Sequence, residues 1–250
     1  MKNHLYIVLP AYNEEANIGK LLDSISCCLP DAGIDNYEIV VVNDGSVDRT
    51  MEILKDYAQR LPLKIVQHEK NKGLGPTIRD GLLFASEAAS DGDIIITMDA
   101  DDTHTPGLVY RMVNTIREGY DVVIASRYRK GARVYGLSCG RRLLSLMASY
   151  IFRLLLPIKG VKDFTCGYRA YRARVLKEAF AKYGDRFIDQ QGFQAMVDII
   201  LQLRSMNVIF GEVPFILRYD MKQGTSKMNV KVTVMKTLKL ILKRKFANKL

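Results

Sequence analysis

The stretch Ile94-Ile95-Ile96-Thr97-Met98-Asp99-Ala100-Asp101 joins a short apolar run directly to two carboxylates. A β-branched run of this length predicts a strand that is buried on both faces. The two aspartates then leave the strand on the same side of the pleat. Hard carboxylate oxygens on one side of a divalent ion leave its other positions to water and phosphate oxygens, so the motif predicts a metal site. The alternative is that Asp101 or Thr103 caps a helix beginning near Pro106.

Short β-branched runs recur on both sides of this stretch. They predict strands over residues 5–9, 37–42, 64–66, 93–98 and 121–125, and a last strand over 208–213 that follows a helix over about 194–204. Apolar residues with the 3.6-residue helical period occupy 18–25 and 54–61. This alternation predicts an α/β fold with a mostly parallel sheet flanked by helices.

Ligands of such sheets bind beyond the carboxyl ends of the strands. Polar segments stand at four of these ends: Pro10-Ala11-Tyr12-Asn13-Glu14, Asn43-Asp44-Gly45-Ser46, Asp99-Ala100-Asp101 and Ser126-Arg127-Tyr128. Asp44 could accept an N–H from the edge of a base, or it could belong to a plain turn that caps the next helix. The glycines at 73 and 75 have neither dinucleotide-site nor P-loop spacing.

Three cations could neutralise a diphosphate or an anionic acceptor, namely Arg127, Arg218 and Lys227. Their alternative role is that of solvated surface charges. His4, His68 and His104 have no metal-ligand spacing, and we expect no catalytic role for them. The four cysteines have no zinc or redox spacing either, so we expect reduced thiols.

The basic charge is concentrated at one end of the chain. The protein has 250 residues, 48% hydrophobic and 26% charged, and a net charge of +10. Nine Lys and Arg residues and no acid follow Asp220. Such a tail predicts contact with an anionic surface, either a membrane or nucleic acid. Because the tail lacks interleaved aromatic residues and no nucleic-acid-binding module is present, we expect no nucleic-acid partner.

Residues 141–156 predict a helix that is apolar on most of its circumference and opens with Arg141 and Arg142. Such a helix suits the interface of a bilayer, although a buried core helix is the alternative. No run reaches the 18 apolar residues of a spanning helix, and the apolar run at 5–9 is too short for a signal peptide. We therefore expect a cytoplasmic protein, peripheral on the cytoplasmic face of a membrane.

Together with Asp163-Phe164-Thr165-Cys166-Gly167-Tyr168-Arg169 and Gly224-Thr225-Ser226-Lys227, these motifs resemble those of the family 2 inverting glycosyltransferases, in particular the dolichyl-phosphate mannosyltransferase-like branch. The resemblance covers nearly the whole chain. It implies a GT-A (Rossmann-like) catalytic domain over 1–228, with the amphipathic interfacial helix inside it, and a basic amphipathic C-terminal helix over 229–250. The chain departs from the pattern at Asn43, at Thr103 and in the longer spacing from Arg218 to Lys227. It contains no tryptophan, which excludes the QxxRW motif of processive synthases.

The resemblance also implies roles for individual residues. Pro10, Tyr12, Glu14, Val42 and Asp44 would line the nucleoside pocket, Asp99, Ala100 and Asp101 would contact the sugar diphosphate, and Arg127, Arg218 and Lys227 would meet phosphates. Asp101 and Thr103 would hold Mg²⁺ or Mn²⁺. Asp99, Asp101 and Arg127 are the expected catalytic residues.

The implied reaction moves mannose or glucose from GDP-mannose or UDP-glucose to a polyprenyl (dolichyl) phosphate at the membrane surface, where a small membrane-spanning partner could share the anchoring. A phosphate monoester has a second pKa of about 6, so this acceptor is already anionic and needs no general base. The alternative is transfer to a hydroxyl of a saccharide or small molecule. That reaction would need a base such as Asp163, Asp189 or Asp198.

Overall fold

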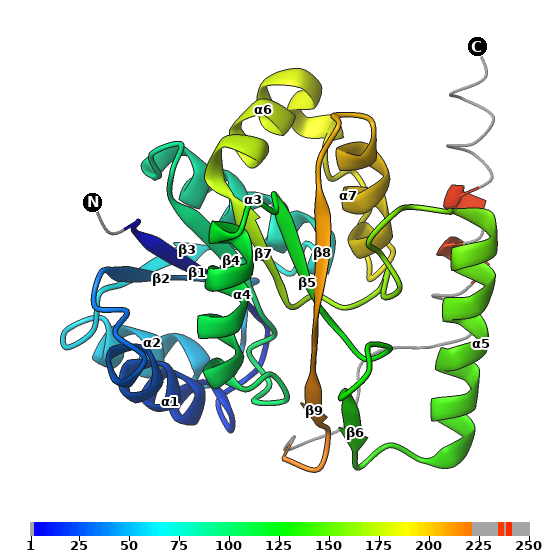
Figure 1. The fold of residues 1–250 in the computed structure, drawn as a ribbon. Helices are drawn as coiled ribbons and strands as arrows, with labels where there is room; N and C mark the ends of the chain where they lie inside the picture. The colour runs from blue at the N-terminus through cyan, green and yellow to red at the C-terminus, as the bar shows by residue number, and fades with distance from the viewer. Residues whose placement is uncertain (1–2, 222–234, 238, 242–250) are drawn as a thin grey trace.

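The computed structural model describes residues 3–221, 235–237 and 239–241 (Figure 1). Its core is a seven-stranded sheet in the order β3-β2-β1-β4-β7-β5-β8. The strands are β1 (Leu5–Ala11), β2 (Tyr37–Asn43), β3 (Leu63–Gln67), β4 (Ile94–Thr97), β5 (Val122–Ser126), β7 (Arg169–Arg172) and β8 (Phe210–Pro214). All six predicted strands are present, with ends that differ by at most two residues.

The parallel strands are buried because their side chains are apolar on both faces. All four residues of β4 are buried, as are all five of β5. One strand of the sheet is not parallel to the others: β7 runs antiparallel to both of its neighbours, β4 and β5. The sequence did not predict this strand, since arginines stand at both of its ends.

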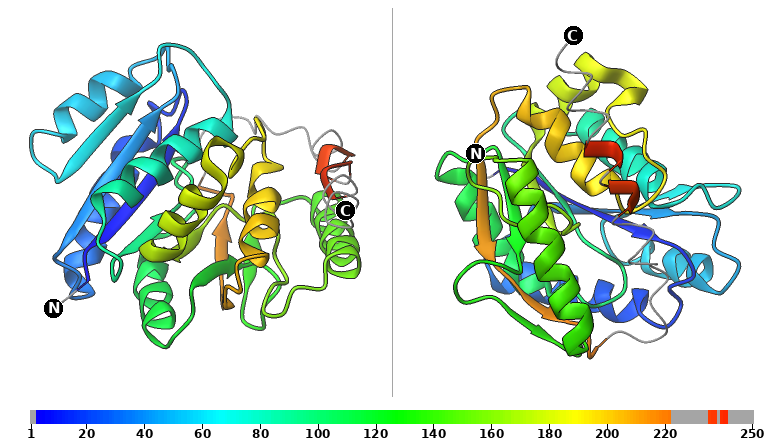
Figure 2. Two further views of the ribbon diagram at one scale, coloured as in Figure 1. Left: turned by 90° about the horizontal axis from the view of Figure 1, so that it is seen from above. Right: turned by 90° about the vertical axis from the view of Figure 1, so that its right-hand side faces the viewer.

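Helices cover both faces of the sheet (Figures 1 and 2). One face carries α1 (Ile18–Asp31), α2 (Thr50–Tyr57) and α4 (Val109–Arg117), with a short 3-10 turn at Pro106–Leu108. The other face carries α3 (Leu74–Ala88), α6 (Ala173–Tyr183) and α7 (Ala195–Arg204), with a second such turn at Gly184–Arg186. The helices predicted over 18–25, 54–61 and 194–204 correspond to α1, α2 and α7. The sequence missed α3 and α6, and a helix near α4 entered only through the alternative that Asp101 or Thr103 caps a helix beginning near Pro106.

A smaller unit lies at one side of the main sheet. It consists of a two-stranded parallel sheet, β6 (Arg133–Tyr135) with β9 (Ile216–Arg218), and helix α5 (Cys139–Leu155). The helical residues 235–237 and 239–241 lie beside α5 in both figures. Lys227 and the domain boundary predicted between 228 and 229 lie outside the described residues.

Helix α5 has two different faces. Ser149 and Phe152 face inward and are buried. Its outer face exposes 60% of Leu143, 54% of Met147, 68% of Tyr150 and 74% of Leu154. These four residues follow the helical period and form one apolar stripe, here called the α5 stripe. The core-helix alternative is therefore wrong for this face. In the described part of the chain, no helix is both long and apolar enough to cross a bilayer.

Candidate active site

A cleft with a volume of about 660 Å³ lies beyond the carboxyl ends of the central strands. Nine of the residues singled out from the sequence line it: Pro10, Tyr12, Glu14, Asp44, Asp99, Ala100, Asp101, Thr103 and Arg127. Val42 is instead buried in β2, and Arg218 is bonded to Asp220 at the surface, 2.9 Å from Nη2 to Oδ2. The fold thus gathers segments that lie between residues 10 and 127 of the chain.

The loop after β1 is fixed to the loop after β2. The Asn13 N–H donates to Ser46 Oγ, and Asn13 Oδ1 accepts the Val47 N–H, both at 2.9 Å. The Glu14 N–H donates to Thr50 Oγ1, also at 2.9 Å. Asn13 has a φ of 52°, in the left-handed region that asparagine tolerates. These contacts keep the Tyr12 to Glu14 segment beside Asp44.

The Asp44 carboxylate accepts three hydrogen bonds. Its Oδ1 accepts from His68 Nδ1 at 2.7 Å and from the Lys72 N–H at 2.8 Å, and its Oδ2 accepts from the Gly73 N–H at 3.0 Å. The next residue, Gly45, has a φ of 67°, and a Cβ there would come within 2.5 Å of the Lys70 carbonyl carbon. Only glycine lets the loop approach this closely. Asp44 does not cap α2, since that helix has no side-chain cap bond.

The Asp99-Ala100-Asp101 motif is followed by a tight turn. Asp102 has a φ of 60°, which turns the chain back so that Thr103 meets Asp101. Asp101 Oδ1 accepts from Thr103 Oγ1 at 2.6 Å and from the Thr103 N–H at 3.2 Å. The 3-10 turn that begins at Pro106 has no side-chain cap, so the capping alternative is wrong for Asp101 and Thr103. Both residues face the cleft instead.

Asp99 is positioned by a buried histidine. His104 Nδ1 accepts the Asp99 N–H at 2.9 Å, which assigns the ring proton to Nε2. Nε2 lies 3.5 Å from Asp99 Oδ2, and the ring stacks on Tyr168 at 5.0 Å between centroids. The Asp99 side chain remains 40% exposed in the cleft. Spacing alone could not have identified His104, because its role depends on a contact with one residue rather than on a ligand pattern.

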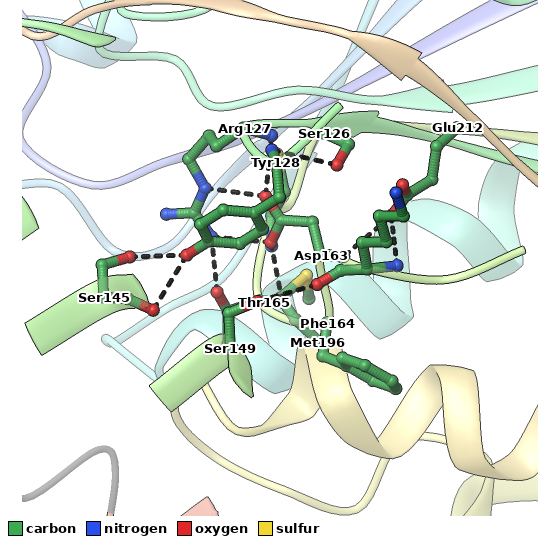
Figure 3. A network of polar contacts seen from close by, with 12 residues as sticks. Ser126, Arg127, Tyr128, Ser145, Ser149, Asp163, Phe164, Thr165, Met196 and Glu212 are labelled. Carbon is green, nitrogen blue, oxygen red and sulfur yellow. Dashed lines mark hydrogen bonds and ion pairs between the residues drawn. The ribbon is translucent and has the colours of Figure 1, made fainter. Parts of the chain in front are cut away.

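Arg127 forms an ion pair with the buried Asp163 (Figure 3). Its Nε donates to Asp163 Oδ2 at 2.8 Å, and its Nη2 donates to Asp163 Oδ1 at 2.7 Å and to Thr165 Oγ1 at 2.6 Å. Burial alone would raise the pKa of Asp163, but the charge and hydrogen bonds of Arg127 lower that pKa below its usual value. Burial alone would lower the pKa of Arg127, and Asp163 raises it well above its usual range. The Arg127 charge is therefore matched within the protein.

The segment 163–169 supplies one wall of the cleft. Arg169 is fully buried and donates to the carbonyl oxygens of Phe164, Cys166 and Met196 at 2.7–2.9 Å. This arginine ties the segment to α7. Burial raises the pKa of the Cys166 thiol to about 12, so the thiol stays protonated. The sequence predicted no such contacts: it used this segment only as a motif of the family resemblance, with Asp163 as a candidate base.

The three candidate general bases do not face the cleft. Asp163 is engaged with Arg127, Asp189 lies on the surface, and Asp198 is buried on α7. None of the three is among the residues that line the cleft.

The oxygen atoms that the protein offers in the cleft can hold a divalent ion only if a bound substrate supplies further oxygen atoms. Within residues 3–221, 235–237 and 239–241, no group of three or more His, Cys, Asp or Glu could hold a metal. Asp99 and Asp101 line the cleft together with the Thr103 hydroxyl. An ion bound there would complete its shell with diphosphate oxygens and water, which is how Mg²⁺ is commonly held.

A twisted, mostly parallel sheet with acidic residues beyond its carboxyl edge is the arrangement of GT-A proteins. The family model described as glycosyl transferase family 2 matches residues 6–180. This chain belongs to that family, and the resemblance drawn from the sequence motifs is confirmed.

Curated relatives agree with this assignment. The chain is 34% identical to a dolichol-phosphate mannosyltransferase of Pyrococcus furiosus over 84% of its length, and 30% identical to a polyprenol monophosphomannose synthase of Mycolicibacterium smegmatis over 89%. It is 35% identical over 68% of its length to an undecaprenyl-phosphate 4-deoxy-4-formamido-L-arabinose transferase of Edwardsiella ictaluri. The chain spans 55%, 80% and 50% of these relatives.

Solved structures share the fold at lower identity. Glucosyl-3-phosphoglycerate synthase from Mycobacterium tuberculosis, in complex with Mn²⁺, UDP and glucosyl-3-phosphoglycerate, has a TM-score of 0.70 and 21% identity over 97% of this chain and 80% of that one. TarS 1–349 of S. aureus, in complex with UDP-GlcNAc, has a TM-score of 0.59 and 20% identity over 96% of this chain and 66% of that one. Both confirm the GT-A fold.

Proposed function

We propose that this protein is an inverting glycosyltransferase that moves mannose or glucose from a nucleoside diphosphate sugar to a polyprenyl phosphate at a membrane surface. The observation that carries this proposal is the composition of the cleft. Its lining includes three carboxylates, those of Asp44, Asp99 and Asp101. It also includes apolar side chains of α5 and of other segments: Leu144, Ala148, Phe152, Phe164, Phe215 and Leu217. A polyprenyl phosphate combines an anionic head with an apolar chain and suits such a cleft. The names of the three curated relatives support the same substrate class.

The donor end can bind a sugar diphosphate through its acidic residues and a divalent ion. Asp99 and Asp101, with the Thr103 hydroxyl, are the residues that would hold Mg²⁺ or Mn²⁺. The ion would offset the charge that develops on the departing diphosphate. Thr103 fixes the Asp101 carboxylate by hydrogen bonds, and His104 fixes the backbone at Asp99. Positioning of this kind lowers the reorganisation needed in the transition state.

The acceptor needs no general base if it is a phosphate monoester. Such a group is largely ionised above its second pKa of about 6, and its oxygen can attack the anomeric carbon from the face opposite the diphosphate. Asp163, Asp189 and Asp198 do not line the cleft, which favours this acceptor over a hydroxyl. Arg127 contributes a positive charge beside the cleft, although Asp163 already balances it.

The membrane-facing surface would be the α5 stripe. A second pocket of about 340 Å³ adjoins the C-terminal end of this helix and is lined by Arg129, Arg153 and Lys162 together with Leu156, Pro157, Ile158, Gly160 and Val161. Cations beside an exposed apolar stripe suit the headgroup region of an anionic bilayer. We propose peripheral attachment on the cytoplasmic face, with a small membrane-spanning partner as an additional anchor.

The proposed reaction is tested by incubating the purified protein with radiolabelled GDP-mannose and UDP-glucose, each with a short polyprenyl phosphate and Mg²⁺ or Mn²⁺. We expect label in the organic phase only when the lipid phosphate is present. The matched control is the corresponding polyprenol, which lacks the phosphate. Equal transfer to the polyprenol or to a soluble saccharide would favour the hydroxyl-acceptor reaction instead.

Membrane attachment should depend on the α5 stripe. Leu154→Glu should reduce co-sedimentation with anionic liposomes at low salt at least severalfold, because it places a negative charge among residues that insert at the interface. Tyr110→Glu is the matched control, since Tyr110 is 51% exposed on α4. Raising the ionic strength should weaken binding of the wild type as well, because screening reduces the attraction of the basic residues. Equal liposome binding by both variants would contradict the proposed surface.

A further inference from the structure

The pocket of about 340 Å³ at the C-terminal end of α5, here called the α5 pocket, is separate from the active-site cleft. None of the residues that line the α5 pocket also lines the cleft. Pockets for small ligands have volumes of roughly 300–1,000 Å³, so this pocket suits one small ligand or the polar end of a larger one. The proposed transfer of a sugar does not use it.

The α5 pocket is positively charged. Arg129, Arg153 and Lys162 line it, and no Asp or Glu does. Among the residues that the structure describes, none of these three cations forms an ion pair with a carboxylate. The sequence around the pocket has no acid to offer, since residues 122–162 contain nine Lys and Arg and no Asp or Glu. The carbonyl end of α5 contributes only about half of a negative charge, so the pocket attracts an anion.

Arg153 is held in place from inside the protein. Its Nε and Nη2 donate to Oγ of the buried Ser149 at 3.3 Å and 2.9 Å. Its guanidinium lies 5.5 Å from the centre of the Tyr128 ring, and the Tyr128 hydroxyl lies 2.7 Å from Ser145 Oγ (Figure 3). An arginine has five N–H donors, so three of them are left for a ligand. Because Ser149 and Tyr128 line the cleft, the α5 pocket adjoins the cleft.

The turn after α5, which forms the rest of the pocket, is also fixed. The Lys162 N–H donates to Oε1 of the buried Glu212 at 2.6 Å, and the Lys162 carbonyl oxygen accepts from Ser149 Oγ at 3.0 Å. Gly160 has a φ of 87°, and a Cβ there would collide with the Phe210 carbonyl oxygen. A pocket whose walls are already ordered loses less entropy when it binds a ligand.

The apolar part of the pocket distinguishes between the possible sources of an anion. Four of the lining residues are apolar: Leu156, Pro157, Ile158 and Val161. Leu154 of the α5 stripe, 74% exposed, directly follows Arg153 in the chain. An inorganic anion would not use apolar walls, whereas a phospholipid carries its phosphate next to an apolar ester region at the height where an interfacial helix lies.

We infer that the α5 pocket binds the phosphate group of an anionic phospholipid, at a site separate from the cleft proposed to take the acceptor. This inference rests on the proposed attachment to a membrane surface, but not on the transfer of a sugar. Arg129, Arg153 and Lys162 donate to the phosphate oxygens, and the apolar walls contact the ester region of the lipid. An occupied pocket would hold the C-terminal end of α5 among the headgroups, directly beside the cleft.

The test uses dihexanoyl phosphatidylglycerol below the concentration at which this short-chain lipid forms micelles. Its binding to the ¹⁵N-labelled protein is followed by NMR of the backbone amides, without nucleotide sugar and without vesicles. We expect saturable shifts of the Gly160 and Val161 signals. Glycerol 3-phosphate offers a phosphate without acyl chains, and it should bind at least about fivefold more weakly because it leaves the apolar walls exposed.

Lys162→Gln should weaken the binding of the short-chain lipid about tenfold, because it removes a charge-assisted hydrogen bond to the phosphate. Lys159→Gln is the matched control. It removes the same charge from the same turn, but Lys159 does not line the pocket, so its affinity should stay within about twofold of the wild type. Arg153→Gln is a second variant inside the pocket, for which we expect a loss at least as large as that in Lys162→Gln.

Equal losses in Lys162→Gln and Lys159→Gln would overturn the inference, because the lipid would then respond to the general positive charge rather than to the pocket. Glycerol 3-phosphate that binds as tightly as the lipid would overturn the phospholipid as the source of the phosphate. Displacement of the lipid by an equal concentration of a short polyprenyl phosphate would assign the pocket to the acceptor instead. If the short-chain lipid binds as expected but the protein does not co-sediment with anionic liposomes, the pocket is confirmed and the proposed membrane attachment is wrong.

Discussion

Replacing Asp101 with asparagine should lower the rate of sugar transfer by about 100- to 1000-fold, the range seen when one group that stabilises developing charge is removed. Asparagine keeps the side-chain shape and an oxygen that can accept from Thr103, so the fold should be preserved. What is lost is the negative charge proposed to hold the divalent ion. The measurement is kcat at saturating donor and metal, together with the thermal unfolding midpoint.

Asp102→Asn is the matched control for this variant. It changes a neighbouring carboxylate in the same turn, and asparagine tolerates the φ of 60° found there. Asp102 is not among the residues that line the cleft. Its substitution should leave transfer near the wild-type rate. Equal loss of activity in both variants would point to the turn rather than to the Asp101 charge.

Replacing Asp163 with asparagine should destabilise the protein by about 3–5 kcal/mol, the usual cost of leaving a buried charge unpaired. Asp163 is fully buried and Arg127 is only 21% exposed, so water can replace the missing partner only in part. The free energy of unfolding is measured in denaturant at pH 7. The double variant Arg127→Met with Asp163→Asn should recover a large part of the loss, because no unpaired charge remains and the asparagine oxygen can still accept from the backbone N–H groups that Asp163 binds. A single variant as stable as the wild type would contradict the view that this pair is energetically coupled.

The same ion pair predicts acid sensitivity. The pKa of Asp163 is lowered in the folded protein, so its contribution to stability is present above the pKa of about 3.9 of the unfolded chain. That contribution is lost as the pH falls through the lower, folded value. In Asp163→Asn this part of the acid dependence should disappear, which urea titrations from pH 5 down to about pH 2 can measure.

The sequence predicted the parallel half of the sheet well because continuous burial leaves a clear apolar pattern. It missed β7, a four-residue strand whose Arg169 is buried by bonding to carbonyl groups rather than by being apolar. No local pattern reveals such a contact. The sequence also missed helix α3, because glycines and short apolar spacings obscure its helical pattern. This helix begins at Leu74, directly after the loop that binds Asp44.

The candidate site, like the fold, could be predicted from the sequence only in part. Residues that directly follow strands could be predicted, since the carboxyl edge of a parallel sheet brings them together. The partners that hold them could not be predicted. His68, His104 and Asp163 act through single contacts with Asp44, Asp99 and Arg127 that depend on the tertiary fold.

The position of β7 in the sheet also sets the order in which the sheet can be assembled. Strands β1 to β4 pair with one another, and the last of them, β4, ends at Thr97. Strand β5 ends at Ser126, yet its partners among the described strands are β7 and β8, which follow it by more than 40 and 80 residues. During synthesis, the half of the sheet that carries Asp44 and Asp99 can therefore pair first. The half that carries Arg127 must wait for the chain to reach Pro214, so the cleft between them becomes complete only after the first half of the sheet has paired.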